Sequence, residues 1–198
     1  YSPAPILPDN MLEEMADLTV RPILRELARD GHPFVGVLYA GLMMTADGPK
    51  VLEYNVRFGD PECQPMLMRL EGDLPRIMLD CVEGRLDPTS IGQSDKTALG
   101  VVMTAKGYPG AYSKGLAIAD IEEADSLPGV KVFHSGTTIR DGALVSSGGR
   151  VLCVTALGND LEDAKKAAYA AVEKVRMTDG FYRTDIGQKG INRLKGIK

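Results

Sequence analysis

Three polar side chains alternate with apolar ones early in the chain, and their types suit phosphoryl chemistry. Glu53, Asn55 and Arg57 are each separated by one residue, so a strand would place them on one face, about 6.6 Å apart. Carboxylate and amide oxygens are hard ligands of the kind that Mg²⁺ takes, and the fork of an Arg binds phosphoryl or carboxylate oxygens. Polar residues at period two are also typical of any half-exposed strand, so a solvated sheet face is the alternative.

The three side chains need a strand to align them, and the sequence predicts one within a hairpin. Residues 50–58 are rich in β-branched and aromatic residues, and the Gly-Asp-Pro at residues 59–61 ends the strand. An apolar run at residues 34–44 comes before it, with a turn at residues 45–49 between the two. These segments predict a β-hairpin whose second strand carries the polar residues.

Helical periodicity flanks this hairpin on both sides. Apolar residues between residues 9 and 31 have the spacing of an amphipathic helix, which Pro22 should kink or divide. After the hairpin, residues 64–70 and 73–83 also have helical periodicity. The first part of the chain is therefore predicted to combine helices with a hairpin.

A second domain is predicted after a linker at residues 88–96, where turn-forming residues cluster. Five short strands are predicted, at residues 97–105, 115–119, 130–135, 143–147 and 150–157. A helix at residues 161–175 follows, because apolar residues recur there at helical spacing. The expected fold class is α+β with an antiparallel sheet, in two domains at residues 1–88 and 96–198.

Composition narrows the functional class. The 198 residues are 44% hydrophobic and 25% charged, the balance of a globular protein. The net charge of -4 shows no basic footprint, so we expect no nucleic-acid partner. No apolar run approaches the roughly 20 residues of a membrane span, and we expect a cytoplasmic protein. Three cysteines at wide spacing suit neither a disulfide framework nor a zinc site.

Short motifs along the chain, in the same order, resemble a known family. The predicted hairpin and the loop after it resemble the last part of an ATP-grasp domain. The further motifs resemble the glycinamide ribonucleotide synthetase family: Tyr1-Ser-Pro-Ala-Pro, Leu38-Tyr-Ala-Gly-Leu-Met, Arg57-Phe-Gly-Asp-Pro-Glu, Leu99-Gly-Val-Val-Met, Gly107-Tyr-Pro-Gly, Phe133-His-Ser-Gly-Thr and Gly148-Gly-Arg-Val-Leu. The resemblance implies the C-terminal portion of an ATP-grasp domain followed by a rudimentary hybrid-motif β-sandwich with a helix.

The resemblance also implies an activity. Members of this family join glycine to 5-phosphoribosylamine through a glycyl phosphate, giving glycinamide ribonucleotide, ADP and phosphate in de novo purine biosynthesis. By resemblance, Glu53 and Asn55 would hold Mg²⁺, or Mn²⁺ in its place, against the phosphates of ATP. Arg57 would stabilise the acyl phosphate or its transition state as the catalytic residue.

Four further residues receive ligand-binding roles from the resemblance. Met43 and Leu52 would contact the adenine side of ATP, with packing in the hairpin core as the alternative. Asp60 and Glu62 would meet the substrate, with plain solvation of the loop as the alternative. In related biotin carboxylase an acidic metal ligand precedes the Glu-x-Asn pair by twelve residues, and Gly41 stands at that position here. We therefore expect only two protein ligands from this stretch.

The chain opens without Met and, by resemblance, corresponds to the C-terminal half of such an enzyme. The N-terminal half, with its phosphate-binding lysines and Gly-rich loop, would then be the missing partner, and we expect the 198 residues alone to be inactive. A non-catalytic binding or assembly module is the alternative function. That alternative predicts stable folding and partner capture without any dependence on Glu53 or Asn55.

Overall fold

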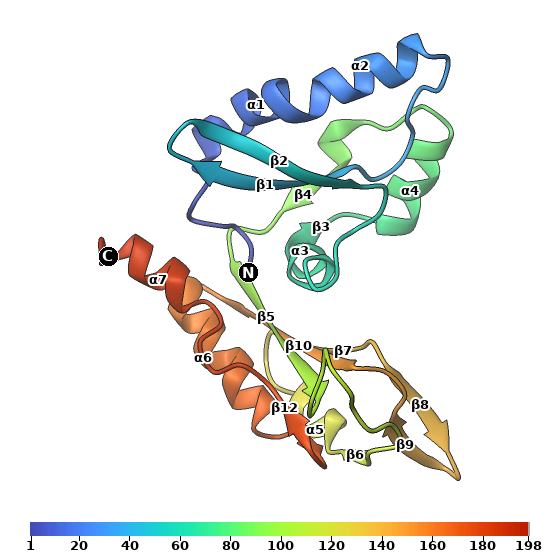
Figure 1. Ribbon diagram of the computed structural model, residues 1–198, viewed down its shortest axis with the longest axis vertical. Helices are drawn as coiled ribbons and strands as arrows, with labels where there is room; N and C mark the ends of the chain where they lie inside the picture. Colours follow the sequence, from blue (N-terminus) through green and yellow to red (C-terminus); the bar gives the residue numbers. More distant parts are fainter. Residues whose placement is uncertain (198) are drawn as a thin grey trace. The chain divides into compact units, whose positions relative to one another are not determined.

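The computed structural model describes residues 1–197, which form helices and small antiparallel sheets (Figure 1). The chain divides into two compact units. Unit 1 contains Tyr1–Pro3, Pro61–Arg69 and the chain from Ser94 onward, and unit 2 contains Ala4–Asp60 and Leu70–Gln93. The last passage from unit 2 to unit 1 falls between Gln93 and Ser94, inside the predicted linker. Among the described residues, no helix is both long enough and apolar enough to cross a membrane.

In unit 2 the predicted first helix is divided, as expected. A 3₁₀ turn (η1, Asp9–Met11) leads into α1 (Leu12–Met15), a π-helical segment (η2, Ala16–Val20) and α2 (Arg21–Arg29). Pro22 lies in the first turn of α2, where its missing N–H group costs no intrahelical bond. The wider π turn directly before it therefore lets the chain continue into α2.

The predicted hairpin is present in unit 2, with shorter strands than expected. β1 (Tyr39–Thr45) pairs antiparallel with β2 (Gly48–Asn55), and α1 and α2 run along this hairpin (Figure 1). The pairing places Gly41 opposite Glu53 and Leu42 opposite Val51, so Leu52 is the extra residue of a β-bulge. The Tyr54 hydroxyl donates a hydrogen bond to the Thr19 carbonyl and ties the hairpin to the helices.

The prediction that one strand carries all three polar residues is wrong for Arg57. β1 begins at Tyr39, whose pairing partner is Asn55, so no backbone partner remains for the residues after Asn55. β2 therefore ends there, and Arg57 lies in a bend. Of the three polar residues, only Glu53 and Asn55 lie on β2, where residues two apart point to the same face.

The remaining elements of unit 2 follow the hairpin in sequence. α4 (Leu74–Val82) begins at Asp73, whose side chain accepts a hydrogen bond from the Arg76 N–H group. A short ladder joins β3 (Leu70–Glu71) to β4 (Gly92–Gln93), and η3 (Pro88–Ser90) lies between α4 and β4. The predicted helix at residues 73–83 is confirmed to within one residue.

Unit 1 is built on a four-stranded antiparallel sheet with the strand order β12-β5-β10-β7. Its strands are β12 (Gly180–Phe181), β5 (Thr97–Ala105), β10 (Arg150–Gly158) and β7 (Val130–His134). The predicted strands at residues 97–105, 130–135 and 150–157 are confirmed. β12 has only two residues and was not predicted.

The core of unit 1 lies between this sheet and α6 (Leu161–Val172), which packs on β5 and β10. Alternation on β5 sends Leu99, Val101, Met103 and Ala105 into this core. Asp160 caps α6 by accepting the Asp163 N–H group at 2.8 Å. On the sheet, α3 (Cys63–Arg69) also contacts β5 and β10, and its Pro65 approaches Gly100.

The smaller elements of unit 1 complete the fold: β6 (Ile118–Ala119), α5 (Ile121–Asp125), β8 (Thr137–Arg140), β9 (Ala143–Ser146), β11 (Arg176–Met177) and α7 (Gln188–Leu194). β6 pairs with β11, and β8 pairs with β9. A mixed fold of helices and small antiparallel sheets is thus confirmed, while the hybrid-motif sandwich stays a prediction. None of the three cysteines forms a disulfide within residues 1–197.

Candidate functional site

Glu53 and Asn55 lie on the same side of β2, as the sequence predicted. The Asn55 Nδ2 atom donates a hydrogen bond to Glu53 Oε1 at 3.2 Å. An amide rotated by half a turn about its last bond presents its oxygen in place of its nitrogen. The pair can therefore offer a carboxylate oxygen and an amide oxygen to one cation on the exposed side of the hairpin.

The side chains of Glu53 and Asn55 are the two that could offer oxygen ligands to a metal ion in this stretch. Gly41 faces Glu53 across the hairpin, and a Cβ atom on Gly41 would lie 3.2 Å from Glu53 Cγ. No group of three or more His, Cys, Asp or Glu residues suited to a metal is found within residues 1–197. The donor set fits Mg²⁺, which commonly keeps several waters and binds proteins through one or two oxygen ligands plus phosphate.

Arg57 is held by the backbone that follows it. Its Nη1 atom donates to the Phe58 carbonyl at 2.8 Å, and its side chain is exposed in the bend after β2. The structure therefore places Arg57 two residues beyond Asn55 without the strand geometry that the sequence predicted. Its catalytic role stays a prediction.

Met43 and Leu52 are both more than half exposed, at 51% and 64% of their surface. Met43 pairs with Lys50 across the hairpin, and Leu52 is the bulged residue of β2. Packing in a hairpin core, the alternative role, is therefore wrong for both within unit 2. Contact with adenine stays a prediction.

Asp60 and Glu62 fall in different units, at the end of the first segment of unit 2 and in unit 1 respectively. Both are exposed, and the Glu62 carbonyl accepts the Met66 N–H group at the start of α3, at 3.3 Å. Pro61 between them belongs to unit 1. The substrate-binding roles of both carboxylates stay predictions.

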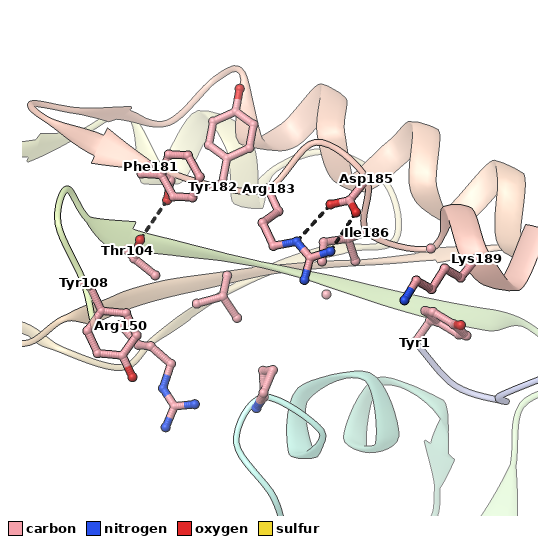
Figure 2. A pocket seen from close by; sticks show the side chains of 14 residues that line it. Tyr1, Thr104, Tyr108, Arg150, Phe181, Tyr182, Arg183, Asp185, Ile186 and Lys189 are labelled. Atoms are coloured by element: carbon pink, nitrogen blue, oxygen red, sulfur yellow. Dashed lines mark hydrogen bonds and ion pairs between the residues drawn. The ribbon is translucent and has the colours of Figure 1, made fainter. Parts of the chain in front are cut away.

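Unit 1 contains a cavity of about 680 Å³ that the sequence did not predict. It lies on the face of β5 that carries Gly100, Val102 and Thr104, which alternate with the core residues of that strand. The other residues that line it are Tyr1, Pro61, Tyr108, Arg150, Phe181, Tyr182, Arg183, Asp185, Ile186, Gly187 and Lys189. Figure 2 shows the side chains around this space.

Three cations and one carboxylate line the cavity. Arg183 forms a bidentate pair with Asp185, with Nε–Oδ1 and Nη2–Oδ2 distances of 2.9 and 2.7 Å. This guanidinium holds the pKa of the Asp185 carboxyl below its usual range. Arg150 and Lys189 come from other segments. Arg150 belongs to the sequence motif at residues 148–152, but nothing in the sequence indicates that it lies near Arg183.

Comparison with known proteins assigns the two parts of the chain. Residues 1–63 match the model for the ATP-grasp (A) domain of phosphoribosylglycinamide synthetase, and residues 98–189 match the model for its C domain. The phosphoribosylamine–glycine ligase of Brucella melitensis is 47% identical over 195 residues, covering 98% of this chain and 46% of that protein. The corresponding ligase of Agrobacterium fabrum is 49% identical, with the same two coverages.

A solved structure agrees with the sequence matches. The phosphoribosylamine–glycine ligase of Thermotoga maritima superposes with a TM-score of 0.78 at 31% identity, covering 91% of this chain and 44% of that one. The chain thus spans about half the length of the curated relatives named above. By these matches the chain belongs to the phosphoribosylglycinamide synthetase family, in which it corresponds to segments of the ATP-grasp domain and the C domain.

Proposed function

We propose that the chain is part of an ATP-dependent ligase that joins glycine to 5-phosphoribosylamine in purine biosynthesis, giving glycinamide ribonucleotide, ADP and phosphate. The observation that carries this proposal is the Glu53–Asn55 pair on one side of β2, in the segment that matches the ATP-grasp domain. The names of the matched relatives support the reaction. A cytoplasmic enzyme that uses ATP and a divalent cation is part of the proposal.

In this proposal Glu53 and Asn55 hold Mg²⁺, or Mn²⁺ in its place, through their side-chain oxygens. The bound cation would supply neutralisation of phosphate charge during phosphoryl transfer. Arg57 reaches the transferring group as a hydrogen-bond donor, since the bend after β2 leaves its side chain exposed. Met43 and Leu52 present apolar surface for the adenine, and Asp60 and Glu62 contact the substrate.

The hairpin supports a further part of this proposal, namely that additional residues of a longer protein cover it. β1 and β2 form a two-stranded sheet, and Val56 is 72% exposed directly after β2. An uncovered strand edge with apolar side chains is a surface that proteins usually pair or cover. We assign that cover to the N-terminal part that the longer relatives have. The domain boundaries at residues 88–96 and the hybrid-motif sandwich belong to the same proposal.

The test fuses the N-terminal part of the Brucella melitensis relative to this chain and measures ADP release with glycine and freshly formed phosphoribosylamine. The fusion should turn over and the 198 residues alone should not. Arg57→Met should lower kcat by about 10²-fold or more, as loss of a transition-state donor commonly does. Glu53→Gln should also lower kcat, because it removes the charged ligand of the proposed cation. Glu14→Gln, an exposed carboxylate on α1, is the matched control and should leave kcat unchanged.

Two results would contradict the proposal. One is a ligase rate for the chain alone that equals that of the fusion. The other is a fusion in which Glu53→Gln and Asn55→Ala leave the rate and its Mg²⁺ dependence intact. The exposed hairpin also fits an assembly module, and that function would give tight capture of the N-terminal part with no effect of either substitution on turnover.

A further inference from the structure

Glu53 and Asn55, the pair proposed to hold the cation, lie on a short piece of β2 between two irregularities. The β-bulge at Leu52 interrupts the pairing directly before Glu53, and the ladder ends at Asn55. Only Glu53, Tyr54 and Asn55 are left between the bulge and the end of the strand. The ends of elements open more readily than their centres, so the arrangement of the pair depends on what else holds these three residues.

The partner strand offers this piece of β2 little beyond its backbone. Gly41 lies opposite Glu53, and Ala40 lies opposite Tyr54. Contacts between side chains on neighbouring strands stabilise a sheet, and a glycine and an alanine supply few such contacts. A contact from outside β1 should therefore have a large effect on how firmly the pair is held.

Tyr54 makes such a contact from the other face of β2. It lies between Glu53 and Asn55, so the alternation of the strand directs its side chain away from theirs. Its hydroxyl donates a hydrogen bond to the Thr19 carbonyl in the π-helical segment η2. We propose that Tyr54 is a positioning residue, whose bond to Thr19 fixes Glu53 and Asn55 where both can offer oxygen to one cation.

The acceptor of this hydrogen bond lies in a well-anchored part of unit 2. Thr19 and Met15 are 5% and 4% exposed, and the Thr19 Oγ1 atom donates to the Met15 carbonyl at 2.6 Å. On the same run of helix, Arg21 pairs with both Asp17 and Glu13. The hydroxyl of Tyr54 therefore joins the end of β2 to a fixed point rather than to a loose loop.

The π turn itself is an uncommon feature that this contact explains. The Arg21 N–H group bonds to the Ala16 carbonyl, five residues earlier, instead of the four of an α-helix. Single π turns within α-helical segments are rare and are often found at functional sites. Here the π turn carries the carbonyl that receives Tyr54, so its role would be to hold the metal-ligand strand.

A fixed pair should bind a cation more tightly than a mobile one. The hydrogen bond between Asn55 Nδ2 and Glu53 Oε1 shows that the two side chains lie within reach of each other. Ordering a mobile segment on binding costs conformational entropy, and Mg²⁺ requires near-ideal geometry of its ligands. Tyr54 would lower that cost without touching the cation. This effect on the cation rests on the proposed function, whereas the hydrogen bond to Thr19 does not.

Hydrogen exchange of single amides, followed by NMR of the 198-residue chain, tests the tie without any metal. Tyr54→Phe keeps the ring and removes only the hydroxyl. The protected amides of residues 53–55 should exchange several-fold faster in this variant, while those of residues 48–51, before the bulge, should change little. Asp73→Ala is the matched control, because it removes the side chain that caps α4 in the same unit. It should leave exchange at residues 53–55 unchanged.

Manganese tests whether the tie acts on the pair. Mn²⁺ is paramagnetic and broadens NMR signals near its binding site, so the side-chain amide of Asn55 should broaden in the wild type. A titration of this broadening gives the Kd for Mn²⁺ alone. Tyr54→Phe should raise that Kd by about threefold or more, because the pair must then be ordered on binding. Asp73→Ala should leave it unchanged.

The fusion with the N-terminal part gives a measurement that separates positioning from loss of the fold. Tyr54→Phe should raise the Mg²⁺ concentration at half of the maximal rate by about threefold or more, and saturating Mg²⁺ should restore the wild-type kcat. A substitution that only destabilised the fold would lower the rate at every Mg²⁺ concentration.

Two results would overturn the proposal. One is unchanged exchange of residues 53–55 in Tyr54→Phe, since the hydroxyl would then hold nothing. The other is faster exchange with an unchanged Kd for Mn²⁺, since the tie would then not act on the pair. A wild-type chain without Mn²⁺ broadening at Asn55, together with a fusion that is insensitive to Glu53→Gln, would contradict the proposed function. Faster exchange in Tyr54→Phe would in that case still support the tie.

Discussion

Asp125 joins α5 to β7 through both oxygens of one carboxylate. Oδ1 accepts the Val132 N–H group at 2.7 Å, and Oδ2 pairs with Lys131 Nζ at 2.5 Å. The Lys131 ammonium, followed by the Val132 N–H group, lowers the pKa of this carboxyl below its ordinary value of 3.8. A lowered pKa in the folded state means that the unfolded chain binds the proton more readily.

The acid stability of the protein should therefore depend on Asp125. The contribution is present in full above pH 3.8 and is lost as the pH falls through the lower pKa of the folded state. Asp125→Asn keeps an acceptor for Val132 but loses the ion pair, and should cost up to about 1 kcal/mol at pH 7. Urea unfolding between pH 2 and 7 measures this difference.

The difference between wild type and Asp125→Asn should shrink toward zero below the folded-state pKa. Glu122→Gln, an exposed carboxylate on the same helix, controls for the general effect of removing a negative charge. A constant difference across the whole pH range would contradict the linkage. So would an equal loss in Glu122→Gln.

Gly41 shows how one position limits the metal chemistry of the hairpin. The sequence places it twelve residues before Glu53, and the register of β1 and β2 places it directly opposite Glu53. The β-bulge at Leu52 shifts the register by one residue, so Gly41, five residues before Ala46, faces Glu53, six residues after Asp47. An acidic side chain at residue 41 would therefore lie beside Glu53, and without one the hairpin offers only the Glu53–Asn55 pair to the proposed cation.

At the scale of elements, apolar alternation predicted the strands of the core. β5, β7 and β10 alternate buried and less buried residues or are buried throughout, and all three were found from the sequence. β8 was not found from the sequence. Its residues, Thr137 to Arg140, are mostly exposed, and a short run of mostly polar residues resembles a loop. The five-residue α5 is too short for a helical period to appear.

The residues of the candidate sites also differ in how far the sequence could predict their positions. Two residues on one strand, such as Glu53 and Asn55, can be related by the period of that strand alone. The position of Arg57 could not be predicted, because the end of β2 is set by where its partner β1 begins. The cavity of unit 1 is lined by segments from residue 1 to residue 189 that meet only in the folded chain. No local sequence pattern indicates which of these segments come together in the folded chain.

Substitution of two leucines in different elements should change the unfolding free energy by very different amounts. Leu52 on β2 is 64% exposed, whereas Leu152 on β10 is fully buried. Leu52→Thr should change the unfolding free energy by less than about 0.5 kcal/mol. Leu152→Ala should lower the unfolding free energy by about 2 to 5 kcal/mol, because it removes buried methyl groups and leaves a cavity.

Urea unfolding measures both leucine variants. Sedimentation velocity adds a second readout, because Leu52→Thr should reduce self-association of the chain if the exposed hairpin is a pairing surface. A loss above 1 kcal/mol for Leu52→Thr would show that residue 52 is packed within the chain. That result would contradict the exposed hairpin and remove the support that it gives to a covering segment.

At the scale of the molecule, buried apolar residues are distributed very unequally between the units. Unit 1 holds a continuous core made by the four-stranded sheet and α6. In unit 2, Met15 is the one buried hydrophobic side chain among the residues described. Since burial of apolar surface is the main stabilising term of folding, unit 1 should be much the more stable.

Hydrogen exchange should therefore separate the two units. Amides of β5, β10 and α6 should exchange through global unfolding of unit 1, while those of β1 and β2 exchange through cheaper local opening. Leu152→Ala should speed exchange in unit 1 and leave the hairpin amides as they are. Mass-spectrometric exchange of peptides from the wild type and this variant gives both comparisons. Equal protection of β2 and β10, or a common acceleration of both by Leu152→Ala, would mean that the units unfold as one. The hairpin would then draw stability from unit 1 rather than from the additional residues proposed to cover it.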